Sequence, residues 1–516
     1  MTNEDVFSST TSLHGDYSVS RLRVQEEGHC EEQHQSLCLA QRPRYIDQCH
    51  LGQAMIDVLP DNVLLEVFDF YREDTTFSVH TSWISTWRWQ ALIQVCRRWR
   101  CVIFGSPLRL DLRVVCTDIT LTRTSLDIWP PFPISISCRY RVDEKCVENV
   151  IAAVEHGRDR ISHISIEYIN GSVLEKLAVA MQQPFPTLKC CCLGSSEDSE
   201  SVPVLPETFL GGSAPLLETF DLDGLPFPTF PRFISSSTHI RYLSIYDIPH
   251  SGYVSPNAMA ACLAALPNLE DLYIGFRSPL SRPPQIAQPP RTRIVLPTVI
   301  QLFFCGVSEY FEDFVARVDT PLLNRLNLTF FMDLVFDLPQ LRHFVGRAEK
   351  LEPLDQAVME FNDRAIWISD SDILPRRFRL QIVCERPDWQ LSSMVQIFGQ
   401  QLPLLSHIKE LEVIQLHYAN IAWIDNPDMD TSQWLELFHQ FIALQRLYVS
   451  AKLVAPVAAA LQELTEETTM EVFPVLHSLF LEGLEQSGPV PEGIKLFVAA
   501  RQLSDHPVAT QSWNRP

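Results

Sequence analysis

Cysteine and histidine side chains, which often bind zinc, gather near the start of the chain. The members of this group are Cys30, His34, Cys38, Cys49 and His50. No pair among them has the C-x-x-C or H-x-x-x-H spacing of a zinc site. We therefore interpret the group as a chance cluster, and we expect no bound metal.

Three consecutive cysteines and two acidic clusters are the other candidates for chemistry. Cys190, Cys191 and Cys192 occupy a strand-like segment where small apolar side chains pack well, which favours a buried structural role over redox or metal chemistry. The acidic clusters at 197–200 and 370–372 lie in polar stretches typical of solvated turns. The chain also lacks the G-x-S-x-G, G-x-x-x-x-G-K-[ST], H-E-x-x-H and helix-opening G-x-G-x-x-G motifs. We expect a non-catalytic protein without cofactors.

Composition narrows the class of partner. The 516 residues are 46% hydrophobic, enough for two or more folded units. A net charge of −22 disfavours binding of the whole chain to nucleic acid or anionic membranes. No segment approaches the roughly 20 apolar residues of a membrane helix, the first residues lack a signal pattern, and the 14 scattered cysteines are typical of reduced thiols. These features predict an intracellular protein, cytoplasmic or nuclear.

One hydrophobic pattern, apolar-x-x-apolar-x-apolar, recurs along most of the chain. Its clearest copies begin at Pro215, Pro267, Pro297, Pro321 and Pro474. The last two apolar positions lie two residues apart, as a strand with one buried face requires. Successive copies from 188 to 341 are about 18 to 30 residues apart, which brackets the period of about 20 to 29 of leucine-rich repeats. Each copy is therefore predicted to be one strand of a repeat.

Segments typical of helices, such as 256–265 and 431–441, separate these strands, so we expect a parallel sheet. The gap from 341 to 408 has room for two further repeats, with a strand at 377–384 and a helix at 388–401. The copies resemble the leucine-rich repeat family, although glycine often replaces the asparagine that usually follows the strand. The resemblance implies an α/β fold, an irregular solenoid shaped as a horseshoe with a parallel sheet. An ordinary α/β domain is the alternative.

Two amphipathic helices are predicted ahead of the repeats, in 56–68 and 92–102. Pro60 suits a first helical turn, and Asp61 places a negative charge near that helix N-terminus. Apolar residues follow at helical spacing in both segments. Together these features predict a small helical unit.

This unit resembles the F-box, with Leu59-Pro60 as the first half of the motif and Val95-Cys96-Arg97-Arg98-Trp99 as the second. The continuation through 104–116 and 126–130 resembles fungal, basidiomycete-type F-box proteins that carry a repeat domain. The resemblance implies a non-catalytic substrate receptor of a Skp-cullin-F-box ubiquitin ligase. The F-box would bind a Skp-family adaptor and, through it, cullin, while the repeats hold an unidentified protein target for ubiquitin-dependent degradation.

The resemblance also implies adaptor-binding positions, and these match Leu59, Pro60, Val63, Leu64, Val67, Phe68, Val95, Cys96 and Trp99. For the leucines, adaptor contact and packing within the unit both remain open, whereas Leu59 and Pro60 favour contact. We expect Leu64→Asp to abolish adaptor binding and leave the repeats folded. An aromatic insertion at 71–90 departs from the family, so a repeat scaffold with a degenerate F-box is the alternative function.

The predicted organisation has five parts. Residues 1–54 are expected to be disordered, 55–117 to form the F-box-like unit, 118–145 to be a linker or first cap, 146–500 to form the repeats, and 501–516 to be a flexible tail. We expect the target to bind at the strand edges and the loops that follow them, including 277–293.

Overall fold

The structure is a computed structural model, and it describes residues 59–73, 88–107, 109–116, 130–138, 144–195, 202–278, 292–331, 336–370, 376–384, 388–415, 431–464, 471–483 and 490–513. The chain divides into two compact units, residues 1–112 and 113–516. The zinc-type cluster at 30–50, the acidic cluster at 197–200, most of the aromatic insertion and most of the 277–293 loop lie outside the described residues. Each unit is considered by itself.

The described part of the first unit consists of three helices, α2 (Asp61–Glu73), α3 (Arg88–Leu92) and α4 (Arg97–Gly105). Helix α2 starts where the proline motif predicts, because the Pro60 carbonyl accepts the Val63 and Leu64 N–H groups at 3.0 and 3.1 Å. The second expected helix is divided. The extended backbone of Cys96 interrupts it, and the Cys96 thiol accepts the Trp99 N–H at 3.4 Å, which caps α4.

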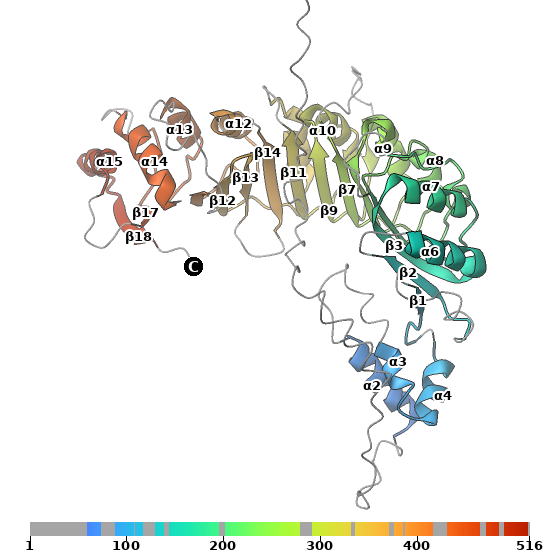
Figure 1. The fold of residues 1–516 in the computed structure, drawn as a ribbon. Helices are drawn as coiled ribbons and strands as arrows, with labels where there is room; N and C mark the ends of the chain where they lie inside the picture. Colours follow the sequence, from blue (N-terminus) through green and yellow to red (C-terminus); the bar gives the residue numbers. More distant parts are fainter. Residues whose placement is uncertain are drawn as a thin grey trace, which may run out of the picture. The chain divides into compact units, whose positions relative to one another are not determined.

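In the second unit the described residues form a long sheet of 16 strands (Figure 1). Its strands, in spatial order, are β1 (Val114–Cys116), β2 (Ile134–Cys138), β3 (Ile161–Ile169), β4 (Cys190–Ser195), β5 (Thr219–Asp223), β6 (Tyr242–Ile248), β7 (Asp271–Phe276), β9 (Gln301–Gly306), β11 (Arg325–Phe331), β14 (Phe378–Val383), β13 (Ala365–Ser369), β12 (Gln356–Phe361), β15 (Glu410–Gln415), β16 (Arg446–Val449), β17 (Ser478–Glu482) and β18 (Ala509–Trp513). A separate parallel pair joins β8 (Ile294–Val295) to β10 (Val318–Asp319). This architecture is an α/β fold consistent with a repeat solenoid.

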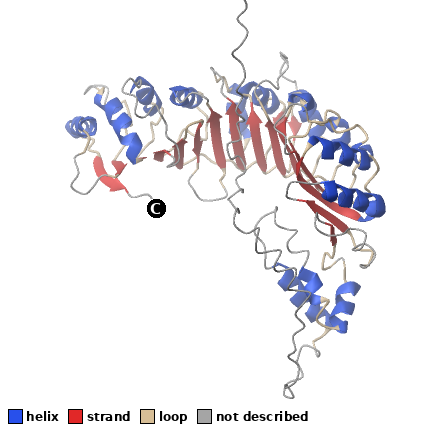
Figure 2. Cartoon of the chain, viewed as in Figure 1, coloured by secondary structure: helices blue, strands red, loops and turns tan. Residues whose placement is uncertain are grey.

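Helices lie along one face of this sheet (Figure 2). They are α6 (Glu144–Gly157), α7 (Gly171–Ala180), α8 (Phe230–Ile234), α9 (Pro256–Leu263), α10 (Ser308–Val315), α11 (Pro339–Arg347), α12 (Asp388–Gly399), α13 (Thr431–Phe438), α14 (Val454–Gln462) and α15 (Glu492–Leu503). Several begin at side-chain caps, since Asn170 accepts the Val173 N–H at 2.9 Å and Ser255 accepts the Ala258 N–H at 3.3 Å. The helices predicted at 256–265 and 388–401 are confirmed.

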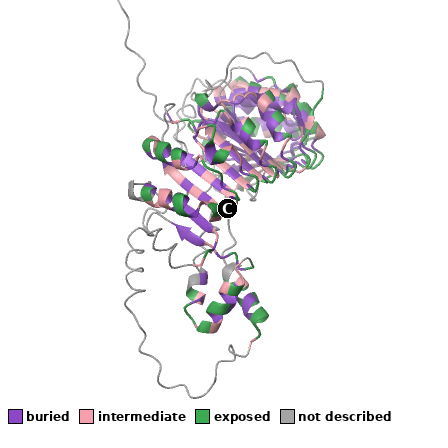
Figure 3. Cartoon of the chain, turned by 90° about the vertical axis from the view of Figure 1, so that its right-hand side faces the viewer, coloured by how far each residue is buried: buried purple, intermediate pink, exposed green. Residues whose placement is uncertain are grey.

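The core of the second unit lies between the sheet and these helices (Figure 3). Strand side chains alternate: Leu272 and Ile274 of β7 are fully buried, whereas Asp271 and Tyr273 are half-exposed. Phenylalanines fill much of the space, and the ring centroids of Phe304 and Phe311 lie 4.7 Å apart. We call the face of the sheet opposite the helices the open face.

The expected parallel sheet has one exception, between 356 and 383. Strand β13 runs antiparallel to both of its neighbours, β12 and β14, while β14 pairs in parallel with β11 and β12 pairs in parallel with β15. The cause is a tight turn at Asn362, whose side-chain oxygen accepts the N–H groups of Arg364 and Ala365 at 2.8 and 2.6 Å. The predicted strand at 377–384 is present, but the expected second parallel repeat is a hairpin.

The sheet extends past both ends of the predicted repeat region of 146–500. Strands β1 and β2 lie in parts assigned to the helical unit and the linker. At the other end, β18 pairs in parallel with β17, so residues 509–513 of the expected flexible tail belong to the sheet. Arg501 is fully buried and donates to the carbonyls of Pro474 and Leu476 at 3.2 and 3.3 Å. This buried anchor explains why the chain stays packed beyond residue 500.

Candidate binding surfaces

The two halves of the F-box-like motif meet in the first unit. Arg98, from the second half, donates hydrogen bonds to the Leu59 carbonyl and to the Asp61 carboxylate, the latter at 2.8 Å. Arg109 forms ion pairs with Glu66 and Asp69 of α2. These arginines therefore hold α2 against the segments around and after α4, and the pairing fixes the start of α2.

A small core lies beneath α2. Leu64 is 0% exposed and Phe68 1%, and the Phe68 ring meets Trp99 edge to face with centroids 4.8 Å apart. Trp99 is itself buried at 9% exposure. These three predicted positions pack within the unit, so they can serve a partner only indirectly, by holding α2 in place.

A second side of α2, next to the buried one, is also apolar but is open to solvent. Val63 is 36% exposed, Val67 46%, Phe70 76% and Tyr71 43%. We call these four residues the α2 stripe. Their spacing of three and four residues places them along one side of the helix. Phe70 and Tyr71 were missed by motif matching, although they continue the helical spacing from Val63 and Val67.

The nine predicted adaptor positions thus divide by exposure. Pro60, Val63, Val67 and Val95 are exposed, Leu59 and Cys96 are half-buried, and Leu64, Phe68 and Trp99 are buried. Adaptor contact by any of them stays a prediction. The three buried members can touch a partner only after a rearrangement of the unit.

A second surface lies on the open face of the sheet, where aromatic rings from neighbouring strands meet. The rings of Tyr242 and Tyr273 lie 5.2 Å apart, those of Tyr273 and Phe303 5.7 Å, and those of Tyr246 and Phe303 5.8 Å. We call Tyr242, Tyr246, Tyr273 and Phe303 the aromatic row. The prediction of target binding at strand edges and loops overlooked it, because the half-exposed strand positions could not be assigned without the registers.

The aromatic row lies among carboxylates. Asp221 of β5 is in register with Ser244 of β6 and, through it, with Tyr273, while Asp271 of β7 is in register with Tyr242. Burial, together with the charges of Asp271 and Asp221, raises the pKa of Tyr273 to about 12, against the lowering effect of Arg325. Burial likewise raises the pKa of Asp271 above its usual range. Tyr242 and Tyr273, whose pKa values burial raises, are therefore neutral phenols beside half-buried acids.

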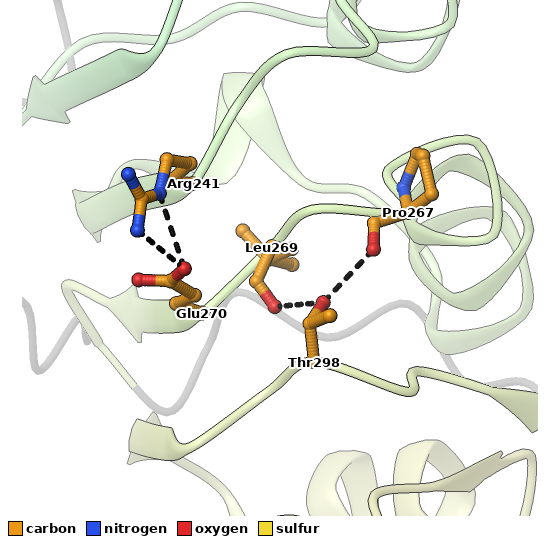
Figure 4. Close-up of polar contacts among 5 residues, drawn as sticks. All are labelled: Arg241, Pro267, Leu269, Glu270 and Thr298. Carbon is orange, nitrogen blue, oxygen red and sulfur yellow. Dashed lines mark hydrogen bonds and ion pairs between the residues drawn. The ribbon is translucent and has the colours of Figure 1, made fainter.

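Successive repeats are tied together where their strands begin, as Figure 4 shows for three of them. The Thr298 hydroxyl lies 3.0 Å from the Pro267 carbonyl oxygen and 2.8 Å from that of Leu269, both in the preceding repeat. Arg241 pairs with Glu270 of the next repeat at 2.6 Å. The residue after the repeat proline thus binds backward along the array, which gives the proline-opened sequence pattern a structural role.

The cysteine triplet lies in β4. Cys191 is fully buried, as predicted, whereas Cys190 and Cys192 are half-buried on the open face with their sulfur atoms 3.6 Å apart. A hydrogen bond from Cys192 lowers the pKa of Cys190. His163, in register with Cys190, is neutral at pH 7, because burial lowers its pKa to about 3. Over the described residues, no group of three or more such side chains is placed to hold a metal ion.

The chain is similar to solved structures of other proteins, at low sequence identity. The leucine-rich repeat-containing protein LegL7 from Legionella pneumophila is similar over 77% of this chain and 98% of its own, at 10% sequence identity and a TM-score of 0.26. No family model and no curated protein matches the chain. A likeness this distant carries no argument, so the repeat architecture rests on the strand order and registers above. Among the described helices, none has the length and apolar content to cross a membrane.

Proposed function

We propose that this chain is the substrate receptor of a Skp-cullin-F-box ubiquitin ligase. In this proposal the helical unit docks on a Skp-family adaptor, and the sheet array holds a protein target. The chain itself performs no chemistry, since ubiquitin transfer belongs to other subunits. The resemblance of Leu59-Pro60 and of 95–99 to the F-box supports it.

The α2 stripe is the observation that carries the proposal. The core beneath α2 already uses Leu64 and Phe68, so its own packing does not require Val67 and Phe70 to be apolar. Large exposed apolar side chains that adjoin on one helix face are typical of a protein-binding surface. An adaptor that covers this face would remove Phe70, now 76% exposed, from water.

The alternative function is a repeat scaffold without ligase work. It shares the array, which supplies an extended surface for protein partners. It differs in what the α2 stripe binds. Capture of a Skp-family adaptor therefore separates the two functions, whereas target binding by the array does not.

The variant Leu64→Asp, chosen from the motif, does not make this separation. Leu64 is 0% exposed, so a carboxylate there would be buried without a partner and would unfold the helical unit. Loss of capture would then report lost folding. Val67→Asp and Phe70→Asp place the charge on the exposed side of α2 instead.

The decisive experiment is capture of purified Skp-family adaptor and cullin by the tagged full-length chain. We expect the wild type to capture both, and Val67→Asp or Phe70→Asp to weaken adaptor binding by tenfold or more with an unchanged circular dichroism spectrum. Val179→Asp is the matched control, because Val179 is 69% exposed on α7 of the array. It should bind as the wild type does.

One result would overturn the proposed function, and another would overturn the assignment of the adaptor contact to the α2 stripe. The first is a wild-type chain that fails to capture an adaptor shown to bind another F-box protein in parallel. The second is undiminished capture by the Val67→Asp and Phe70→Asp chains. The first result would favour the scaffold function, and the second would place the adaptor contact away from the α2 stripe.

A further inference from the structure

The open face of strands β5, β6, β7 and β9 combines aromatic rings with one sign of charge. These four strands contain Asp221, Asp223, Asp247 and Asp271 and have no lysine or arginine. Asp247 is paired with Arg277 at 2.9 Å, at the end of the strand. The remaining three carboxylates lie on the face that carries the aromatic row.

The basic side chains near this surface are mostly committed to other acids. At the starts of the strands, Lys189 pairs with Glu218 at 3.0 Å and Arg241 with Glu270 at 2.6 Å. Each of these two cations therefore has an acidic partner at the start of its strand. The next two strands, β11 and β14, begin a basic region with Arg325 and Arg379, the latter over the Trp367 ring at 5.0 Å. The acidic part of the open face therefore ends between β9 and β11.

The chain is built to hold the rings in place. Gly275 lies under Tyr246, where any Cβ would stand 2.5 Å from the ring carbon Cδ2, so only glycine leaves room for the ring. Gln301 donates a hydrogen bond to the Tyr273 hydroxyl and accepts one from Arg325 at 3.4 Å. The rings are thus preorganised, and a ligand that binds them need not order them.

We propose that the aromatic row and its aspartates bind an arginine-bearing extended segment of the target protein. The guanidinium group is planar and cationic, so it stacks on an aromatic ring while its N–H groups donate to a carboxylate. Alternate side chains of an extended peptide lie about 7 Å apart, so two of them can reach rings that belong to different strands of the row. This inference deepens the proposed function and rests on it, because it names the target chemistry that the array recognises.

Asp271 is the acid best placed to respond to such a ligand. Its carboxylate forms no hydrogen bond or ion pair with any described residue. Burial and the charge of Glu270 raise its pKa, and the charges of Arg325 and Arg241 oppose this rise. A guanidinium beside it would lower that pKa and favour the charged carboxylate. Binding should therefore take up no proton, and it should weaken at high salt because the attraction is partly electrostatic.

The test is fluorescence anisotropy of the full-length chain with labelled peptides of alternating glycine and arginine, lysine or glutamate. We expect the arginine peptide to bind at least several-fold more tightly than the lysine peptide, and the glutamate peptide not to bind. Tyr242→Ser and Asp271→Asn should each weaken arginine-peptide binding by fivefold or more. Equal binding of arginine and glutamate peptides would overturn the inference.

Phe480→Ser is the matched control, because Phe480 stacks on Tyr448 at 4.3 Å in a second aromatic group of the same sheet. It should bind the arginine peptide as the wild type does. An equal loss in Phe480→Ser and Tyr242→Ser would overturn the assignment to the aromatic row. Circular dichroism on each variant confirms that the sheet remains folded.

The inference and the proposed function fail separately. Val67→Asp should bind the arginine peptide normally, and Tyr242→Ser should capture the adaptor normally. Adaptor capture without arginine-peptide binding would reject the aromatic row as the target site and leave the receptor function standing. Arginine-peptide binding without adaptor capture would support the aromatic row and reject the receptor function.

Discussion

The two units use apolar residues in different ways. In the array, one side of each strand is buried against helices, and the other carries half-exposed polar and aromatic groups, as Phe304 and Phe303 of β9 show. In the helical unit, α2 is apolar on two adjacent sides, with Leu64 buried and Val67 exposed. The array exposes apolar side chains such as Val179 scattered over separate elements, whereas α2 gathers four exposed apolar side chains on one helix. This group marks the surface that we assign to a partner.

The largest expected effect concerns the alternation of buried and half-exposed side chains along each strand of the array. Phe304→Ala should lower the free energy of unfolding by about 3 to 5 kcal/mol, because the ring is 0% exposed and packs against Phe311 and Phe330. Phe303→Ala removes the same side chain from the open face and should cost about 1 kcal/mol. Urea denaturation of both variants measures the difference. Equal losses would mean that the open face is part of the core.

A smaller difference in stability between a buried and an exposed position is expected in the helical unit. Leu64→Ala should destabilise it by about 2 to 4 kcal/mol, while Val63→Ala should change its stability by less than about 0.5 kcal/mol. Hydrogen exchange of the α2 and α4 amides reports this unit separately from the array. If Val63→Ala loosened α2 as much as Leu64→Ala does, the α2 stripe would be a core surface, and the contrast between the units would disappear.

Much of the array was predictable because its pattern is local. Spacings such as Leu269, Leu272 and Ile274 place a strand and its buried side, and the structure buries all three. The antiparallel hairpin was not predictable in this way. Strands β12 and β13 are buried on both faces, and their reversal depends on the Asn362 turn rather than on a periodicity.

The candidate surfaces were only half predictable, for a physical reason. A helical pattern shows that Val63, Leu64, Val67 and Phe68 are apolar, but which of them face a core depends on where α4 packs. The aromatic row required even more, since Tyr242, Tyr273 and Phe303 belong to three different repeats. Only the strand registers bring them together.

The smallest expected effect concerns the contact between one repeat and the next. The described part of the helical unit has a single core and therefore no such contact. Glu312 of α10 accepts the N–H groups of Gln340 and Leu341 at 2.7 Å and so caps α11 of the following repeat. Burial raises the pKa of Glu312 to about 7, helped by the nearby Asp337 and Asp313 and opposed by the two N–H donors. Between about pH 4.5 and pH 7, the folded chain therefore keeps a proton that the unfolded chain releases.

The free energy of unfolding should accordingly fall as the pH rises through this window and should level off above pH 7. The total fall should be on the order of 1 kcal/mol once the partial exposure of Glu312 is allowed for. Urea midpoints at pH 5 and pH 8 measure the change. Glu312→Gln should lose this part of the pH dependence, because an amide does not titrate, whereas Glu309→Gln, an exposed position on the same helix, should keep it. A Glu312→Gln chain with the wild-type pH profile would show that this cap does not couple α10 to α11 through its charge, and that the repeats cohere through their shared apolar core, as the helical unit does.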